Sequence, residues 1–161
     1  MATLEFLEDD NGKQQAYDFI VRLAEIAMVD EKVQDLVHRI SQMLALLESV
    51  GVPPIGSRDF QLQKLDGSPF MLAPVVKDLR HHKPLYEARI NYNRDYALRM
   101  IFFYGFDEDG EEVIYFTRAI LKDDTGKSRA FKELEVQIEN MGFEQACLES
   151  EVMYRRFSLG K

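Results

Sequence analysis

The chain has 161 residues, of which 46% are hydrophobic and 30% charged, enough to bury the core of one domain of ordinary size. The net charge of −8 argues against a protein that coats nucleic acid with a uniformly basic surface. The single cysteine, Cys147, excludes an internal disulfide, and three histidines are too few for an imidazole cluster, so we expect neither a metal nor another cofactor.

Charge is unevenly distributed along the chain. Residues 1–50 carry 4 basic and 10 acidic side chains, residues 51–105 carry 8 and 5, and residues 106–161 carry 8 and 13. The middle of the chain is therefore a basic island between acidic flanks. The first ten residues have neither the basic start of a signal peptide nor the long apolar run of a membrane span, so we expect a cytoplasmic protein.

Apolar residues recur at helical spacing in two segments before Gly51. The first stripe begins after Lys13 and consists of Tyr17, Ile20, Val21, Ala24, Ala27 and Met28. The second begins after Asp30, which suits an N-cap, and consists of Val33, Leu36, Val37, Ile40, Met43, Leu44 and Leu47. Gly51, Pro53 and Pro54 end this second segment. We predict a hairpin of two amphipathic helices with both stripes packed in the core.

Short β-type segments follow the prolines. The stretch FQLQKL (60–65) predicts a strand, whereas PFMLAPVVKDL (69–79) leaves strand and irregular structure open. Residues 85–92, 96–104 and 112–121 predict an antiparallel meander, with a turn at Asp109-Gly110 before its last strand. The segment from residue 125 to 157 predicts helix, with an apolar stripe at Phe131, Leu134, Ile138 and Met141 and a break at Gly142.

Arginines stand in the meander strands where apolar residues would be easier to bury. The turn lengths place Arg89 opposite Arg99, and Arg118 opposite Ile101, so these three arginines share a face with Lys122. We predict that this face also carries Glu87, Ile101, Phe103 and Phe116. The other face is predicted to carry Tyr86, Ala88, Ile90, Leu98, Met100, Phe102, Val113, Tyr115 and Ala119.

Like charges directly opposite each other destabilise a strand pair, so the position of these cations requires an explanation. Two interpretations remain open at this point. In the first, Glu87 neutralises one arginine and the remaining cations reach solvent. In the second, the guanidinium groups form an anion site, since their planar forks match phosphate oxygens.

The order of these segments and their short sequence motifs resemble the RelE/ParE toxin superfamily, and within it the HigB-like, phage-derived branch. That branch has a helical hairpin, a K-x-L segment, an LYELRI-type strand, a YRVLYFF-type strand, an acidic turn with glycine, and a strand ending in VKK. Here the corresponding stretches read VVKDL (75–79), LYEARI (85–90), YALRMIFFY (96–104), DEDG (107–110) and VIYFTRAILKDD (113–124). The resemblance covers roughly residues 15–140.

The resemblance implies a single α+β domain of RelE-like fold, with an N-terminal helical hairpin packed on a curved antiparallel meander and with C-terminal helices. Its core would span about residues 15–140, and a helical extension about residues 141–157. It further implies the toxin of a type II toxin-antitoxin system, acting as a ribosome-dependent, metal-independent mRNA endoribonuclease. The implied partners are a cognate antitoxin of helix-turn-helix type, the ribosome and mRNA.

Such a nuclease directs a ribose 2′-hydroxyl at the neighbouring phosphate, which requires a base, a cation on the phosphate and an acid at the leaving oxygen. By resemblance, Arg99 and Arg89 would stabilise the phosphate, and Lys122 would be a further phosphate contact or the general acid. The candidates for substrate binding are Arg118, His82, Lys77 and Tyr96. His81 is a further candidate for the base, and Tyr115 for base stacking, although sheet tyrosines commonly pack in the core.

Three interpretations of function therefore remain open. The chain is a ribosome-dependent mRNA endonuclease, or a protein of the same fold that binds a protein target such as DNA gyrase without cleaving RNA. The third is a phage-borne relative whose groove binds an antitoxin or another partner without toxicity.

Overall fold

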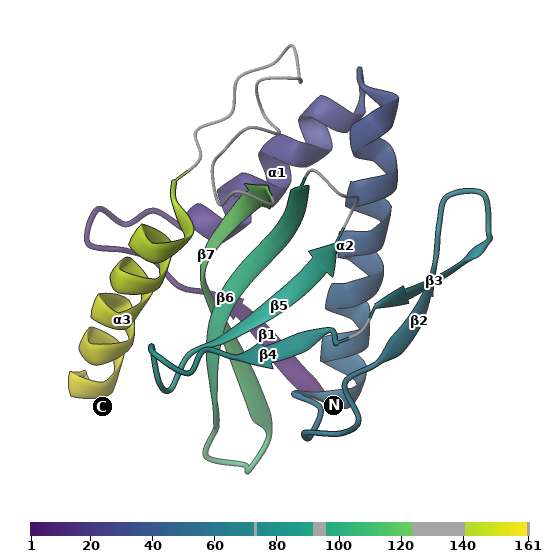
Figure 1. Cartoon of the computed structure of the whole chain (residues 1–161). Coiled ribbons are helices and arrows are strands. Elements are labelled where there is room, and N and C mark those ends of the chain that lie inside the picture. The colour runs from purple at the N-terminus through teal and green to yellow at the C-terminus, as the bar shows by residue number, and fades with distance from the viewer. Residues whose placement is uncertain (73, 92–95, 124–140, 161) are drawn as a thin grey trace.

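The computed structural model describes residues 1–72, 74–91, 96–123 and 141–160. Its elements, in chain order, are β1 (Ala2–Phe6), α1 (Gln15–Ala27), α2 (Glu31–Val50), β2 (Phe60–Gln63), β3 (Pro69–Leu72), β4 (Val76–Asp78), β5 (Tyr86–Asn91), β6 (Tyr96–Phe106), β7 (Glu112–Asp123) and α3 (Phe143–Leu159). The α+β class is confirmed (Figure 1). The turn at 92–95 and the expected helical stripe at Phe131, Leu134 and Ile138 lie outside the described residues. No helix in the described part of the chain is both long and apolar enough to cross a lipid bilayer.

Five strands form the main sheet in the order β1-β7-β6-β5-β4. The antiparallel meander of β5, β6 and β7 is confirmed, including the pairing of Arg89 with Arg99 and of Ile101 with Arg118. The sheet as a whole is mixed, because β1 pairs parallel to β7 at one edge. The expectation of a wholly antiparallel sheet is wrong at this edge, since β1 joins it through a partner more than a hundred residues away, which no local turn specifies.

The segment PFMLAPVVKDL, left open above, contains two short strands. Pro69–Leu72 is β3, which pairs with β2 in a separate two-stranded hairpin. Val76–Asp78 is β4, which forms the edge of the main sheet beside β5. The predicted strand at FQLQKL is confirmed as β2.

The helical hairpin covers one face of the sheet (Figure 1). In α2 the predicted stripe is confirmed, and the helix ends before Gly51, whose positive φ of 75° and N–H bond to the Leu47 carbonyl (2.8 Å) are those of a left-handed cap. In α1 the predicted stripe is mostly wrong. The buried residues are Ala16, Phe19, Leu23, Ile26 and Ala27, while Tyr17, Val21, Ala24 and Met28 are exposed. Both sets recur at helical spacing, so the periodicity did not fix which face turns inward.

A β-bulge in β7 changes which side chains share a face. Ile101 pairs with Arg118 but Phe102 pairs with Phe116, so Thr117 is an extra residue in β7. Phe116 and Ile114 consequently lie in the core under α1 and α2, whereas Val113 and Tyr115 lie on the arginine face. The predicted faces of Phe116, Val113 and Tyr115 were therefore wrong, because uninterrupted alternation was assumed through Thr117.

Helix α3 packs on the arginine face of the sheet, beside β7 and β6 (Figure 1). It buries a second, smaller core, whose members include Ile101, Phe103, Val113, Tyr115, Ile120, Ala146 and Cys147. The bulge contributes to this contact, because the buried Thr117 hydroxyl donates to the Ile101 carbonyl (3.1 Å) and lies within hydrogen-bond distance of the Ser150 hydroxyl on α3 (2.7 Å). The arginine face is thus partly covered by apolar packing and partly left as a recess.

Candidate functional site

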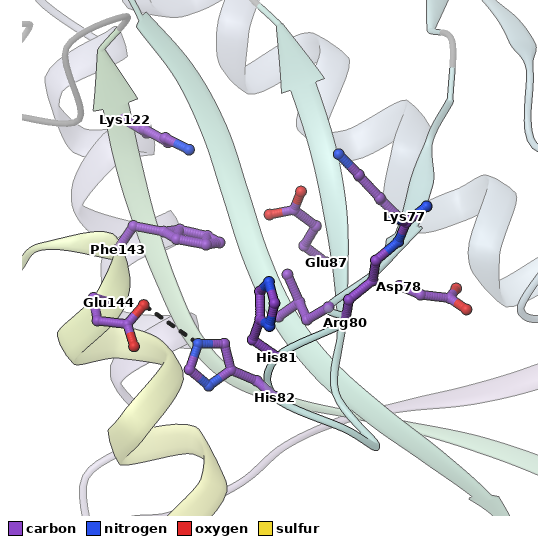
Figure 2. Close-up of a pocket in the computed structure, with 10 residues that line it drawn as sticks. Lys77, Asp78, Arg80, His81, His82, Glu87, Lys122, Phe143 and Glu144 are labelled. Carbon is purple, nitrogen blue, oxygen red and sulfur yellow. Dashed lines mark hydrogen bonds and ion pairs between the residues drawn. The ribbon is translucent and has the colours of Figure 1, made fainter.

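The recess is a pocket of about 470 Å³ on the α3 side of the sheet. Its walls come from β4 and the loop after it, from β5, from the end of β7, and from the first residues of α3. The side chains that the argument uses are Lys77, Arg80, His81, Glu87, Lys122 and Phe143 (Figure 2). Lys77 pairs with Glu87 across β4 and β5, so the alternation of the strands directs both side chains to this face.

Glu87 lies between the two paired arginines of the meander. Its Oε1 atom is 3.9 Å from the Nε of Arg89, and its Oε2 atom is 3.6 Å from the Nε of Arg99. The Glu87 and Arg99 side chains are 7% and 9% exposed. This charge pairing offsets the repulsion that Arg89 and Arg99 would otherwise exert on each other across the strands. The predicted pairing of Glu87 with an arginine is therefore confirmed, and it extends to both arginines. The accompanying expectation that the remaining cations reach solvent is wrong for Arg118, which is 6% exposed and paired with Glu149 and Asp9.

The environment of Arg99 lowers its pKa from 12.5 to about 10. The largest cause is burial, which disfavours the charged guanidinium, and the positive charge of Arg89 acts in the same direction, while Glu87 opposes both. Arg99 is still a cation at neutral pH. The Arg89–Glu87–Arg99 cluster consequently has more positive than negative charge. Of its three members only Glu87 is among the described residues that line the pocket, so the predicted phosphate-binding arginines adjoin the pocket through Glu87 and do not form its surface.

Three further cations stand around the pocket. Lys77 and Arg80 are exposed, and Lys122 is half-buried with its Nζ 4.6 Å from the centre of the Phe143 ring. Lys122 and Phe143 approach each other from β7 and α3 (Figure 2). No ion pair joins Lys77, Arg80 or Lys122 to an acid within the described residues. Within the part of the chain that the structure describes, these three charges are not neutralised by an acid and can face an anionic ligand.

The acidic side chains of the pocket are each held by a basic group. Asp78 pairs with Arg58 (2.6 Å), and Glu144 pairs with His82 (3.3 Å, dashed in Figure 2). With Glu87 placed between Arg89 and Arg99, the acids of the pocket are already engaged. Among the described residues, three cations and three acids line the pocket, and the local balance becomes positive once Arg58, Arg89 and Arg99, which pair with Asp78 and Glu87, are included.

His82 joins the loop after β4 to α3. Its Nδ1 lies 2.8 Å from a Glu151 oxygen and its Nε2 lies 3.3 Å from a Glu144 oxygen. Burial disfavours the imidazolium, but hydrogen bonds and charge from Glu151 and Glu144 outweigh that effect and raise the pKa of His82. The side chain predicted to bind substrate is thus a clamp between two carboxylates in this structure, while the neighbouring His81 is exposed in the pocket.

The remaining predicted site residues are distributed differently. Arg118 is 6% exposed and pairs with Glu149 of α3 (3.0 Å) and Asp9 (3.5 Å), and it is not among the described residues that line the pocket. Tyr115 packs against Phe103 and Phe157, which agrees with core packing rather than base stacking. Tyr96 begins β6, but its side chain lies outside the described part of the structure.

Sequence reasoning did not assign a functional role to Glu87, Arg80 or Phe143. Glu87 carried a usable signal, because strand alternation placed it on the arginine face. Arg80 and Phe143 carried none, since one lies in a loop and the other reaches the pocket only through the packing of α3. Among the described residues, no group of three or more histidine, cysteine, aspartate or glutamate side chains is arranged to hold a metal ion.

Comparison of the chain with models of protein families, with curated proteins and with solved structures found no match.

Proposed function

We propose that this chain has a RelE/HigB-like fold and is the toxin of a toxin-antitoxin pair, acting in the cytoplasm as a ribosome-dependent mRNA endonuclease. The observation that carries the proposal is the cation group of the pocket. Lys77, Arg80 and Lys122 line a recess together with Glu87, which pairs with Arg89 and Arg99, and the other two acids of the recess are paired as well. The order of helical hairpin, meander and C-terminal helix also agrees with the resemblance described above.

In the proposed reaction, the pocket holds the phosphate that the neighbouring 2′-hydroxyl attacks. Negative charge grows on the phosphoryl oxygens as the new bond forms, and fixed cations in a partly dry site stabilise that charge. Arg99 and Arg89 contribute positive charge from the cluster with Glu87, the member of that cluster that lines the pocket. In this reaction Lys122 contacts the phosphate or protonates the leaving oxygen, and Lys77 and Arg80 contact the flanking phosphates; all three line the pocket.

The proposed partners follow from the same surface. The ribosome would present mRNA to the pocket, and an antitoxin of helix-turn-helix type would neutralise the toxin by covering it. Because the positive charge is local, docking through this pocket is compatible with a chain whose net charge is −8.

Primer extension on mRNA in a reconstituted translation reaction tests the proposal. We expect cuts that require the ribosome and that fall at least tenfold in Arg99→Ala, because loss of a cation at the reacting phosphate typically costs a few kcal/mol. The matched control is Arg22→Ala, which changes a half-exposed arginine of α1 on the opposite side of the sheet and should cleave like the wild type. Thermal denaturation of both variants separates loss of activity from loss of fold. Intact mRNA with the wild-type protein would overturn the proposal.

A second candidate function is a protein of the same fold that binds a macromolecular target without cleaving RNA. Arg99 and Arg118 are buried beside carboxylates. This favours the second candidate, because a buried cation that is paired with an acid can stabilise the fold without taking part in a reaction. Inhibition of gyrase supercoiling without mRNA cleavage would support this candidate against the first.

A further inference from the structure

The turn between β6 and β7 extends beyond the rest of the main sheet (Figure 1) and carries an acidic tip, which we define as Phe106, Glu108, Asp109 and Glu111. Phe106 is 64% exposed, and the three acids are exposed and form no ion pair within the described residues. The Asp107 carboxylate accepts the N–H groups of Asp109 and Glu111 (both 2.9 Å), which holds the turn in shape. The acidic tip therefore presents three carboxylates and an aromatic ring to solvent.

The pocket described above has the complementary properties. Lys77, Arg80 and Lys122 are not paired with an acid in the part of the chain that the structure describes, and the half-buried ring of Phe143 lines the same recess (Figure 2). Complementary charges steer two surfaces together and fix how they dock. The carboxylates of the acidic tip match the cations of the pocket, and the ring of Phe106 matches the aromatic side chain in the pocket wall.

The acidic tip and the pocket of one chain lie too far apart to meet. Strand β7 begins at Glu112, beside the acidic tip, and Lys122 stands near its other end. At the rise of a strand, these two residues are separated by roughly 30 Å. Because β6 and β7 stay paired along this length, the turn does not fold back onto its own pocket. A contact between the two surfaces therefore joins separate copies of the chain.

We propose that the acidic tip of one copy occupies the pocket of a second copy. Because each copy carries both surfaces, a twofold arrangement makes both contacts at once and closes the assembly at two chains. Each contact is small, so the pair forms only at high protein concentration and depends on both contacts. In the pair, carboxylates fill the position that an anionic ligand would take, so each copy blocks the pocket of the other. The inference uses only the charges of the two surfaces and does not require the chain to be a nuclease.

Sedimentation equilibrium of the full chain tests this pairing. In about 0.05 M KCl, where the screening length exceeds about 10 Å, we expect the average mass to rise with protein concentration from 18.7 kDa toward twice that value. In about 1 M KCl, where the screening length falls to roughly 3 Å, the mass should stay at 18.7 kDa. The series extends to roughly 0.5 mM protein, within the affinity range of weak protein contacts.

Charge reversal identifies the two surfaces. The tip variant Glu108→Lys/Glu111→Lys and the pocket variant Lys77→Glu/Arg80→Glu each place like charges at both contacts. Each variant alone should therefore associate at least about tenfold more weakly than the wild type. An equal mixture of the two variants restores opposite charges at both contacts, so it should associate within about threefold of the wild type. Thermal denaturation of each variant separates loss of association from loss of fold.

The control is Glu8→Lys/Glu31→Lys, which replaces two exposed glutamates outside both surfaces and changes the net charge as much as the tip variant does. It should associate like the wild type. A wild type that stays at 18.7 kDa in low salt would overturn the proposal, as would single variants that associate normally or a mixture that does not associate. An average mass above that of two chains would overturn the closed pair. A wild type that cleaves no mRNA would overturn the proposed function and leave this pairing unaffected.

Discussion

Single side chains in this protein take their roles from the groups that face them. Arg89, Arg99 and Arg118 all lie on one face of the sheet, yet two of them pair with Glu87 at the pocket and the third joins α3 to Asp9, in the loop between β1 and α1. His81 and His82 are adjacent in the chain, yet one is exposed and the other lies between two carboxylates. Residue type alone did not distinguish these environments.

The ionic clamp on His82 predicts a pH-dependent contribution to stability. Because its pKa is raised in the folded protein above the unfolded value near 6.5, the stabilisation is complete below pH 6.5 and is lost as the pH rises through the folded pKa. We expect His82→Gln to lower the free energy of unfolding by about 1–2 kcal/mol at pH 6, the usual range for a charge-assisted hydrogen bond, and by progressively less up to pH 9.

Urea unfolding at pH 6, 7, 8 and 9 measures this difference. His81→Gln is the matched control, because the exposed imidazole of His81 should give the same small difference at every pH. A constant deficit for His82→Gln between pH 6 and pH 9 would show that packing, rather than the charge of the clamp, links the loop to α3.

Among the elements, α3 decides how much of the arginine face is accessible. Its apolar side chains cover the part of the sheet around Phe103 and Tyr115, and its first residues, Phe143 and Glu144, form one wall of the pocket. Polar contacts at Thr117, Arg118 and His82 fix its position. Detachment of α3 would therefore open the pocket and expose its apolar surroundings together.

Cys147 offers a direct probe of this docking. Burial, with smaller contributions from nearby acids that include Glu144, raises the pKa of its thiol to about 12, and the side chain is fully buried, so the native thiol should resist a disulfide reagent at pH 8. We expect Arg118→Gln to label at least tenfold faster, because losing the buried pairs to Glu149 and Asp9 should lower the free energy of local opening by about 1.4 kcal/mol or more.

The control for this experiment is Arg156→Gln, which removes an ion pair between Arg156 and Asp10 that is more than half exposed on both sides. Exposed pairs contribute little, so its labelling rate should stay within twofold of the wild type. Equal rates in the two variants would mean that Arg118 does not hold α3 in place.

At the scale of the whole molecule, the distribution of charge matters more than its total. The acidic flanks give the net charge of −8, but the pocket brings together Lys77, Arg80 and Lys122, and its Glu87 pairs with Arg89 and Arg99. An acidic protein with this basic recess should bind a polyanion weakly over most of its surface and more strongly at the recess, through a small number of phosphates.

The number of these phosphate contacts can be measured from the salt dependence of the affinity for RNA. Three rim cations predict a slope of about −2 in log affinity against log salt concentration, since each phosphate contact on a single strand contributes about −0.7. Anisotropy of a labelled short single-stranded RNA between 50 and 300 mM KCl, about the range in which such contacts are screened, measures the slope. We expect Lys77→Gln to reduce its magnitude by about 0.7.

Lys64→Gln is the control for the salt series, because Lys64 is exposed near the turn of the β2–β3 hairpin and outside the pocket. It should leave the slope unchanged. A slope near zero for the wild type would show that the pocket does not bind phosphate groups of RNA.

The sequence by itself determined the helical hairpin, the meander and the pairing of Arg89 with Arg99, because these depend on periodicity and on turns that join neighbouring residues. Only the tertiary structure decided the inward face of α1, the parallel edge at β1, the bulge at Thr117 and the position of α3. Glu87 shows the boundary between the two. Strand alternation placed it beside the arginines. The burial of its side chain, and of an Oε2 atom that has no hydrogen-bond partner, arises from packing between segments far apart in the chain, which local rules do not encode.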